Sequence, residues 1–462
     1  MEKPSALERF NNWVRKSVTL KLLSIGFLIL ILLIPSTMMQ SLIREREITR
    51  DEAVKEVSSK WGGNQQIGGP IISIPYTILS KDQYGKTETR IEYAHFLPDK
   101  INISGSLAPE KRYRGIYEVV LYNAKLLIEG NFSLLNFDAL NVPMQNYIFK
   151  DAVLTLGITD MKGIKENITA KLNDKTAAFN PGINTHDIFT SGISVPVKMD
   201  SAGLNFNLNL NLNGSSGIYF LPFGKETNVT INSSWGNPSF EGAFLPDKRD
   251  VNANGFSANW KILELNRNYP QQGTGVFVSA LRNEDFDGGD FMLNKNISNA
   301  SGFGVKLLLP VDEYQKTMRS AKYCLMFIII TFLSFFFVEV LKKKRMHPIQ
   351  YLLVGFAAVL FYVLLLSVSE HLNFNKAYLI GCIIILTLIT FYAKAIFKNN
   401  FVALLMCCIL ALLYGFFYSL LQLQDYALLM GSIGLLLILI TIMYLTRNID
   451  WYSVSGEKEE KQ

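Results

Sequence analysis

The chain has 462 residues, of which 49% are hydrophobic and 18% charged, and it carries a formal net charge of +6. The basic excess lies near the two ends of the chain, and residues 44–319 are close to neutral, so the sequence lacks the basic footprint of a nucleic-acid-binding domain. The four cysteines, Cys324, Cys382, Cys407 and Cys408, all lie in apolar runs of the C-terminal third, which excludes a disulfide framework or a cysteine-based zinc site in the middle of the chain.

The N-terminal segment 1–21 is basic and is followed by an apolar run, Leu22–Ile34, that continues less strongly to Ile43. A basic start before an apolar core fits either a secretory signal peptide or an uncleaved anchor. No small-residue cleavage site follows Ile34, and the apolar stretch is long enough to cross a bilayer. We therefore expect a first transmembrane helix over residues 22–43, with residues 1–21 in the cytoplasm.

A short amphipathic helix is expected next. Thr49-Arg-Asp-Glu52 has the spacing of a capping box. The residues that then fall on one helical face are Ala53, Val54, Val57 and Trp61. Gly62-Gly63 should end this helix.

From there to about Leu309 the pattern is mainly β. The clearest segment is Leu204–Asn213, in which apolar residues alternate strictly with asparagine, as in a strand with one buried and one solvated face. Further strands are expected at Ile71–Leu79, Thr87–Phe96, Ile101–Leu107, Ile116–Ile128, Val153–Ile158, Ile193–Met199, Gly217–Leu221, Thr227–Ser233, Phe256–Leu265 and Gly304–Leu309. Many short strands predict sandwich-like layers, and we assign residues 44–322 to one large mainly-β domain.

A pentapeptide occurs twice in this domain, as Phe96-Leu-Pro-Asp-Lys100 and as Phe244-Leu-Pro-Asp-Lys248. Each copy is followed by a strand that begins with glycine, which suggests two similar β-sandwich-like units. A coincidental match is the equal alternative.

The C-terminal third contains five apolar runs of spanning length, separated by short polar turns. They predict transmembrane helices at 323–341, 349–367, 377–397, 401–421 and 427–446, followed by a cytoplasmic tail over residues 447–462. The expected architecture is thus a polytopic membrane protein with six transmembrane α-helices, one before and five after the inserted β domain.

Basic residues indicate the orientation of these spans. Lysine and arginine are concentrated in four segments, 1–21, 342–345, 394–398 and 447–462. Two short loops connect the helices at their opposite ends. One of these loops contains a single basic residue, Lys376, and the other contains no basic residue. Since cytoplasmic loops carry the basic excess, both termini should be cytoplasmic and residues 44–322 should be periplasmic.

Three ionisable residues near the membrane are candidate functional residues. Glu370 and His371 follow the third span, where they could handle protons or bind a metal, although polar capping of a helix end is the favoured interpretation. Glu339 is the acidic residue clearly within a span, so an ion pathway is conceivable. Local pairing with Lys342, three residues further on, is the favoured interpretation.

No catalytic signature accompanies these residues. The sequence contains no HExxH metal motif, G-x-S-x-G nucleophile elbow or P-loop. We therefore expect a non-enzymatic protein without cofactor or metal.

Several motifs resemble those of the CreD family, bacterial inner-membrane proteins described as cell-envelope integrity proteins. The resemblance covers nearly the whole chain and rests on Gly69–Tyr76, Arg114–Val119, Trp235–Gly242 with Phe244–Pro246, Pro310–Tyr314, His347–Gly355, Phe361–His371 and Ala377–Ile380. It implies an inner-membrane protein with a periplasmic domain, whose production is tied to the Cre two-component system and whose level alters envelope properties. The family provides no biochemical activity or catalytic residue to transfer.

These observations favour a membrane protein that supports envelope integrity or the stress response, with the lipid bilayer as one partner and an envelope protein or cell-wall component as another. The alternative is a transporter or lipid-handling channel with an extracytoplasmic cap, which predicts a polar cavity among the later spans. A signalling receptor would need a partner kinase. The oligomeric state is not predicted.

Overall fold

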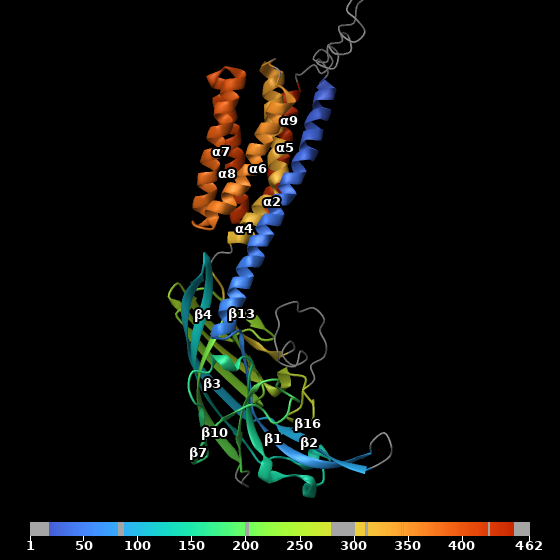
Figure 1. The fold of residues 1–462 in the computed structure, drawn as a ribbon, viewed down its shortest axis with the longest axis vertical. Coiled ribbons are helices and arrows are strands. Elements are labelled where there is room, and N and C mark those ends of the chain that lie inside the picture. The colour runs from blue at the N-terminus through green and yellow to red at the C-terminus, as the bar shows by residue number, and fades with distance from the viewer. Residues whose placement is uncertain are drawn as a thin grey trace, which may run out of the picture. The chain divides into compact units, whose positions relative to one another are not determined.

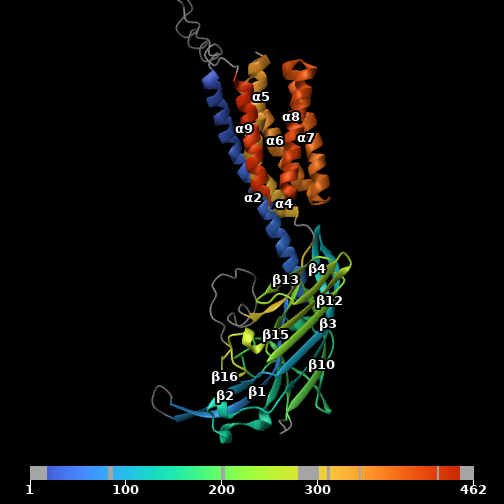
Figure 2. The same cartoon turned by 180° about the vertical axis from the view of Figure 1, so that it is seen from behind.

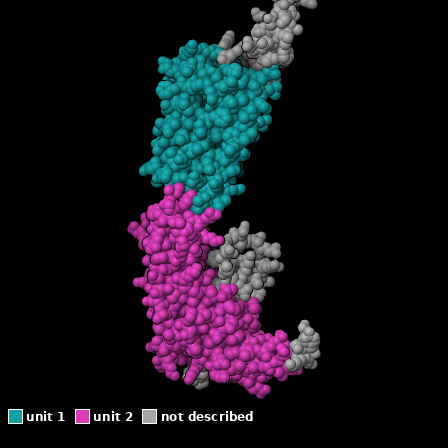
Figure 3. Space-filling model, in the orientation of Figure 1, with its two compact units in different colours: residues 1–50, 311–462 teal, residues 51–310 magenta. Residues whose placement is uncertain are grey.

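The computed structural model describes residues 18–81, 87–198, 203–278, 301–309, 313–342, 344, 346–423 and 426–447, so that most of the predicted N-terminal segment and the predicted tail lie outside the described residues. The chain forms two compact units, a helical unit (1–50 and 311–462) and a β unit (51–310), coloured separately in Figure 3. Residues 44–50 and 311–322, which the sequence assigns to the β domain, are grouped with the helical unit in this division, and the domain boundaries stay a prediction.

The first helix, α2 (Val18–Trp61), is a single uninterrupted helix (Figure 1). The Thr49 hydroxyl donates a 2.9 Å hydrogen bond to the carbonyl of Glu45, one helical turn earlier, so Thr49 does not cap a new helix. The prediction of a separate amphipathic helix is therefore wrong. The physical reason is that residues 44–61 contain neither glycine nor proline, so nothing stops the helix.

Gly62 ends α2. Its φ of +143° favours glycine, and a Cβ there would lie 2.6 Å from the carbonyl oxygen of Asn213. The chain can thus turn from α2 toward the first strand only through a residue without a side chain.

The remaining helices of the helical unit follow in chain order (Figures 1 and 2): α4 (Glu313–Lys322), α5 (Cys324–Lys342), α6 (Pro348–Ser369), α7 (Phe374–Phe397), α8 (Asn400–Gln422) and α9 (Ala427–Thr446). The sequence did not predict α4, which buries Tyr314, Thr317 and Ala321 along one face and meets α5 at a 44° bend. That spacing of i, i+3 and i+7 is typical of an amphipathic helix.

Among the described residues, α2, α6, α7 and α8 are each long and apolar enough to cross a membrane, and the bent pair α4 and α5 makes a fifth candidate. The described apolar part of α9, Leu428–Tyr444, is shorter. The prediction of an N-terminal apolar helix, a large mainly-β domain and several further apolar helices is confirmed. The count of six spans stays a prediction.

Two of these helices begin with side-chain caps. His347 Nδ1 accepts a 3.3 Å hydrogen bond from the Ile349 N–H, and the His347 N–H donates a 2.9 Å bond to Gln350 Oε1, so the two residues form a capping box. Asn399 caps α8 by accepting from the N–H groups of Phe401 and Val402. These polar groups satisfy backbone donors that the helix itself leaves unpaired.

The β unit consists of two sheets. The described strands of the first sheet follow the order β13-β17-β11-β1-β5-β9-β8, with β2 beside β1 and β16 beside β2. Their bounds are β1 (Gln65–Lys81), β2 (Thr87–Phe96), β5 (Val153–Ile158), β8 (Asn180–Pro181), β9 (Gly192–Pro196), β11 (Gly217–Leu221), β13 (Pro238–Gly242), β16 (Gln272–Thr274) and β17 (Phe303–Leu307).

The described strands of the second sheet follow the order β14-β15-β12-β3-β4-β10-β6-β7. Their bounds are β3 (Lys100–Arg114), β4 (Tyr117–Phe132), β6 (Thr169–Leu172), β7 (Lys175–Ala178), β10 (Leu204–Ser215), β12 (Glu226–Ser233), β14 (Lys248–Asn252) and β15 (Gly255–Leu263). Apolar side chains from both sheets form one continuous core, which includes Ile72, Phe96, Leu210, Phe220 and Trp260.

The two copies of the pentapeptide occupy unequal places in this arrangement. The first leads into β3, which pairs with β4 and β12 inside the second sheet, and the second leads into β14, which pairs with β15 at the edge. Both halves of the sequence contribute to the same core. The division into two similar units therefore gains no support from the strand order and stays a prediction.

Candidate functional site

The outward face of the second sheet is built from amide and hydroxyl side chains. Along β10 the leucines Leu208, Leu210 and Leu212 are buried, whereas Asn205 and Asn209 are exposed, as the period of two requires. Neighbouring strands add side chains of the same kind at matching positions. We call this surface the amide face and define it by Asn102, Ser104, Ser106, Asn205, Asn207, Asn209, Asn211, Asn228, Thr230 and Asn232.

Part of the amide face is paired across strands. Asn228 donates a 2.9 Å hydrogen bond to Asn102, its register partner on the parallel strand β3. Glu129, opposite Asn102 on β4, accepts from Asn207 on β10. These bonds join β12 to β3 and β4 to β10, and the four side chains lie in one row of the strand register.

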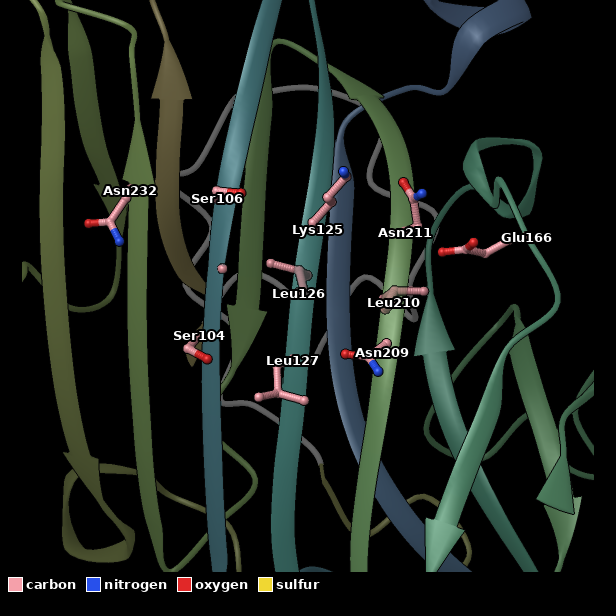
Figure 4. Close-up of a pocket in the computed structure, with 11 residues that line it drawn as sticks. Ser104, Ser106, Lys125, Leu126, Leu127, Glu166, Asn209, Leu210, Asn211 and Asn232 are labelled. Carbon is pink, nitrogen blue, oxygen red and sulfur yellow. The ribbon is translucent and has the colours of Figure 1, made fainter. Parts of the chain in front are cut away.

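Further along the same strands the face is hollowed, with a volume of about 700 Å³. Figure 4 shows Ser104 and Ser106 on β3, Asn209 on β10, and Glu166 at one side. We call this depression the amide hollow; Lys125, Leu127, Asn211 and Asn232 also line it.

The amide hollow combines donors and acceptors with one cation, one carboxylate and three leucines, Leu126, Leu127 and Leu210. Asn232, Ser106, Lys125 and Asn211 are successive partners in the strand register, so they form a polar row across its floor. Amides and hydroxyls both donate and accept hydrogen bonds. Such a surface suits a neutral polar ligand with several hydroxyl or amide groups.

The helical unit contains a buried ion pair at Glu339. The carboxylate of this residue, which is 5% exposed, pairs with Lys21 Nζ from α2. It also accepts hydrogen bonds from the Tyr351 hydroxyl at 2.9 Å and from the Met346 N–H at 3.1 Å. The expected partner Lys342 is therefore wrong, because the side chain points into the bundle, where α2 supplies the lysine.

Glu370, the second candidate, ends α6. It accepts a 3.2 Å hydrogen bond from the Tyr314 hydroxyl, and its Oε1 lies 3.8 Å from Arg46 Nε. His371, the next residue, is exposed. Among the described residues no group of three or more His, Cys, Asp or Glu side chains could hold a metal ion.

The structure does not bring Glu339 and Glu370 together. Tyr351, which contacts Glu339, and Glu370 lie near opposite ends of α6, about 28 Å apart at 1.5 Å per residue. Each carboxylate instead receives a basic residue of α2, Lys21 at one end and Arg46 at the other. A functional role for Glu339, Glu370 or His371 stays a prediction.

Tyrosines and phenylalanines fill the interior of the helical unit. Phe327 packs against Tyr414 and Phe361, with ring centroids 4.7 and 6.4 Å apart, and Tyr362 is 1% exposed. The Tyr378 hydroxyl donates to the carbonyl of Tyr414. The tyrosines Tyr362, Tyr378 and Tyr414 are thus packed against aromatic neighbours in the interior of the bundle.

A buried polar chain in the first sheet was not predicted. Ser73 Oγ lies 2.9 Å from Nδ1 of His95, and His95 Nε2 lies 3.0 Å from Asp187 Oδ2. The hydrogen bond from His95 lowers the pKa of the Asp187 carboxyl below its usual value.

The order of these groups is that of a hydrolase triad, but Ser73 is 1% exposed and therefore closed to a substrate. His95 is stacked between Tyr93 and Phe277. Ser73 and His95 are paired across two strands that the sequence predicted. Asp187 lies in a segment without regular secondary structure, so no periodic pattern in the sequence indicates its position.

Several apolar helices of spanning length around a packed interior, together with a β unit that carries a polar hollow, define a multi-pass membrane protein. Residues 17–452 match the family model described as inner membrane protein CreD. The chain is 32% identical to the inner membrane protein CreD of Escherichia coli (strain K12) over 446 residues, which cover 95% of this chain and 94% of the relative. The chain therefore belongs to the CreD family, and the resemblance stated from its motifs is confirmed.

Proposed function

We propose that this protein supports the integrity of the cell envelope as a non-enzymatic binding protein, with its β unit in the periplasm and both termini in the cytoplasm. Six spans are proposed, with α9 as the last. The amide hollow carries the proposal, since it gathers hydrogen-bonding side chains from four neighbouring strands in one shallow, open depression. Its ligand is proposed to be a polar envelope component, either a cell-wall saccharide or a polar segment of an envelope protein.

The orientation is tested by labelling single cysteines with a membrane-impermeant maleimide in spheroplasts. Cysteine at Asn209, on the amide face, should react before lysis, and cysteine at Lys342, at the end of α5, should react only after lysis. Labelling of the two positions in the reverse order would refute the orientation.

Binding is tested with a photo-crosslinking amino acid placed in the full chain in intact envelopes. Positions Ser106 and Asn209 lie in the amide hollow, and Asp250 on the exposed edge strand β14 is the matched control. We expect an envelope adduct from the two hollow positions only. Lys125→Glu should reduce that adduct, whereas Lys248→Glu on β14 should not.

Equal adducts at all three positions, or none from the hollow, would refute binding at this site. Identification of the adduct by mass spectrometry then separates a saccharide from a protein.

A second candidate function, lipid handling, has one supporting observation. An apolar groove of about 690 Å³ runs along α8 and is lined by Cys408, Ala411, Leu412, Gly415, Phe416 and Ser419. A Cβ at Gly415 would meet open space, so Gly415→Leu fills the groove without displacing a neighbour. If lipid handling is the function, this variant should lose a co-purifying lipid and the envelope phenotype together; under the first proposal it should keep the phenotype.

A further inference from the structure

The strands β1 and β2 extend beyond the body of the first sheet as a two-stranded ribbon, seen in Figure 1. β2 pairs with β1 along its whole length, but it pairs with β16 only at Ala94–Phe96. Within the described part of the chain, no strand pairs with the other edge of β2 over Thr87–Glu92. An unpaired edge is a template for another strand, and a ribbon of two strands is only marginally stable in water.

The backbone groups at this edge can be assigned from the neighbouring hydrogen bonds. The Gly275 N–H donates a 3.1 Å bond to the carbonyl of Tyr93, so Tyr93 directs its backbone groups away from β1. Because the direction alternates along a strand, Thr87, Thr89 and Ile91 also present their N–H and C=O groups at the free edge. Glu88 and Arg90 direct theirs toward β1.

We propose that β2 pairs antiparallel with β2 of a second copy of this chain, with Thr89 opposite Thr89 at the two-fold axis. In this register Thr87 lies opposite the second copy's Ile91, so every outward backbone group between Thr87 and Ile91 finds a partner. On the other face, Glu88 lies opposite the second copy's Arg90, and Arg90 opposite its Glu88. The strand is therefore self-complementary in charge as well as in hydrogen bonding.

Neighbouring registers fail on the same criteria. Centring the pair on Arg90 would place two arginines opposite each other and Glu88 opposite Glu92, and it would pair Thr87 with Tyr93, whose carbonyl already accepts from Gly275. Centring it on Ile91 would require the Tyr93 carbonyl, which already accepts from Gly275. The register centred on Thr89 satisfies both the charges and the backbone groups.

One face of the ribbon carries exposed apolar side chains, which the dimer would bring together. Leu79 is 79% exposed and Ile91 is 60% exposed. Leu79 pairs with Thr89, and Thr77 pairs with Ile91, so these side chains lie on one face, opposite Glu88 and Arg90. Pairing of two ribbons would join these faces into one surface of a four-stranded sheet.

The register is tested by disulfide crosslinking of the full chain in native membranes. Opposed residues in a hydrogen-bonded antiparallel pair have Cα atoms about 5.5 Å apart, within reach of a disulfide. On mild oxidation, Thr89→Cys should give a covalent dimer by itself. Thr87→Cys and Ile91→Cys should each fail alone but crosslink when the two variants are co-expressed. The chain with only its natural cysteines is the background control.

Charge exchange provides an independent test. With Thr89→Cys as the reporter, Arg90→Glu should lower the crosslinking rate about tenfold, because each Glu88 then meets a glutamate of the second copy. Glu88→Arg combined with Arg90→Glu should restore the rate, because the opposite charges are re-established with their positions exchanged.

Three results would overturn the proposal: no dimer from Thr89→Cys in correctly inserted protein, equal dimer from all three single cysteines, or a Thr89→Cys adduct with a different protein in place of the dimer. The last result would mean that the edge binds a foreign strand. Envelope binding by the amide hollow is measured separately, by its own crosslinks, so the failure of either proposal leaves the other testable.

Discussion

Lys21 and Glu339 are separated by 318 residues in the sequence, and their charged groups form an ion pair that joins α2 to α5. The Tyr351 hydroxyl and the Met346 N–H complete the environment of the carboxylate. A carboxylate in such apolar surroundings is stable only while these partners are present.

We expect Lys21→Met to destabilise the protein strongly, because it leaves Glu339 charged and unpaired. Loss of one partner of a buried pair costs about 3–5 kcal/mol, and the partial exposure of Lys21 favours the lower end of that range. Thermal unfolding of the detergent-solubilised protein measures the effect. Lys21→Met with Glu339→Met should be less destabilising than the sum of the two single changes, and Lys342→Met should have little effect. Additivity would mean that the two residues do not interact.

The second prediction concerns the two faces of β10. Leu210, 1% exposed, points into the core, and its neighbour Asn209 points outward. Leu210→Ala should lower the stability of the β unit by about 3 kcal/mol because it leaves a cavity. Asn209→Ala should change it by no more than about 0.5 kcal/mol. Urea unfolding followed by tryptophan emission measures both. Similar values for the two variants would contradict the assignment of faces.

The third prediction concerns the end of α2. Gly62→Ala should destabilise the β unit by about 2 kcal/mol, because alanine rarely adopts φ of +143° and its Cβ would collide with the Asn213 carbonyl. The matched control is Gly115→Asn in the turn between β3 and β4. Gly115 has φ of +61° and open space around it, and asparagine tolerates that conformation. The control should remain close to the wild type in the same unfolding measurement.

The fourth prediction is a pH dependence at Asp187. Because the pKa of its carboxyl is lower in the folded protein than in the unfolded chain, the contribution of this residue to stability is present above the unfolded value of about 4. It is lost as the pH falls through the lowered folded value. Asp187→Asn should therefore be less stable than the wild type at pH 7. The difference should shrink between about pH 5 and pH 3 in unfolding curves measured at each pH. A constant difference would show that His95 does not stabilise the charged carboxyl.

Regular periodicity explains which parts of the fold were predictable. The alternation in β10 and the apolar runs of α6, α7 and α8 identify their elements because each has one dominant environment, a half-buried sheet or a membrane. Edge strands such as β13 and β14 were missed. Neither has a buried residue, because β13 is mostly half-buried and β14 is exposed throughout, so no alternation marks them.

Partners distant in the sequence were not predictable. The spacing of Glu339 and Lys342 suggested a local pair, but the true partner Lys21 depends on how α2 packs against α5, which no local pattern reports. Likewise, the sequence at Thr49 has the spacing of a capping box, but α2 continues through this position. A residue with that spacing caps a helix only where the helix begins. The sequence predicted one part of the amide hollow, the asparagine-bearing face of β10. It did not predict which residues of neighbouring strands line the hollow beside that face.

The two ion pairs of α2 also limit how this helix can move. Lys21 and Arg46 bind carboxylates near opposite ends of the bundle, so a piston-like displacement by one helical turn of 5.4 Å would have to break both contacts at once. Between them lies Pro35, which lacks an N–H and so leaves a carbonyl of the preceding turn without its usual donor. Because an ion pair lies on each side of Pro35, we expect α2 to bend at this residue rather than slide along its axis.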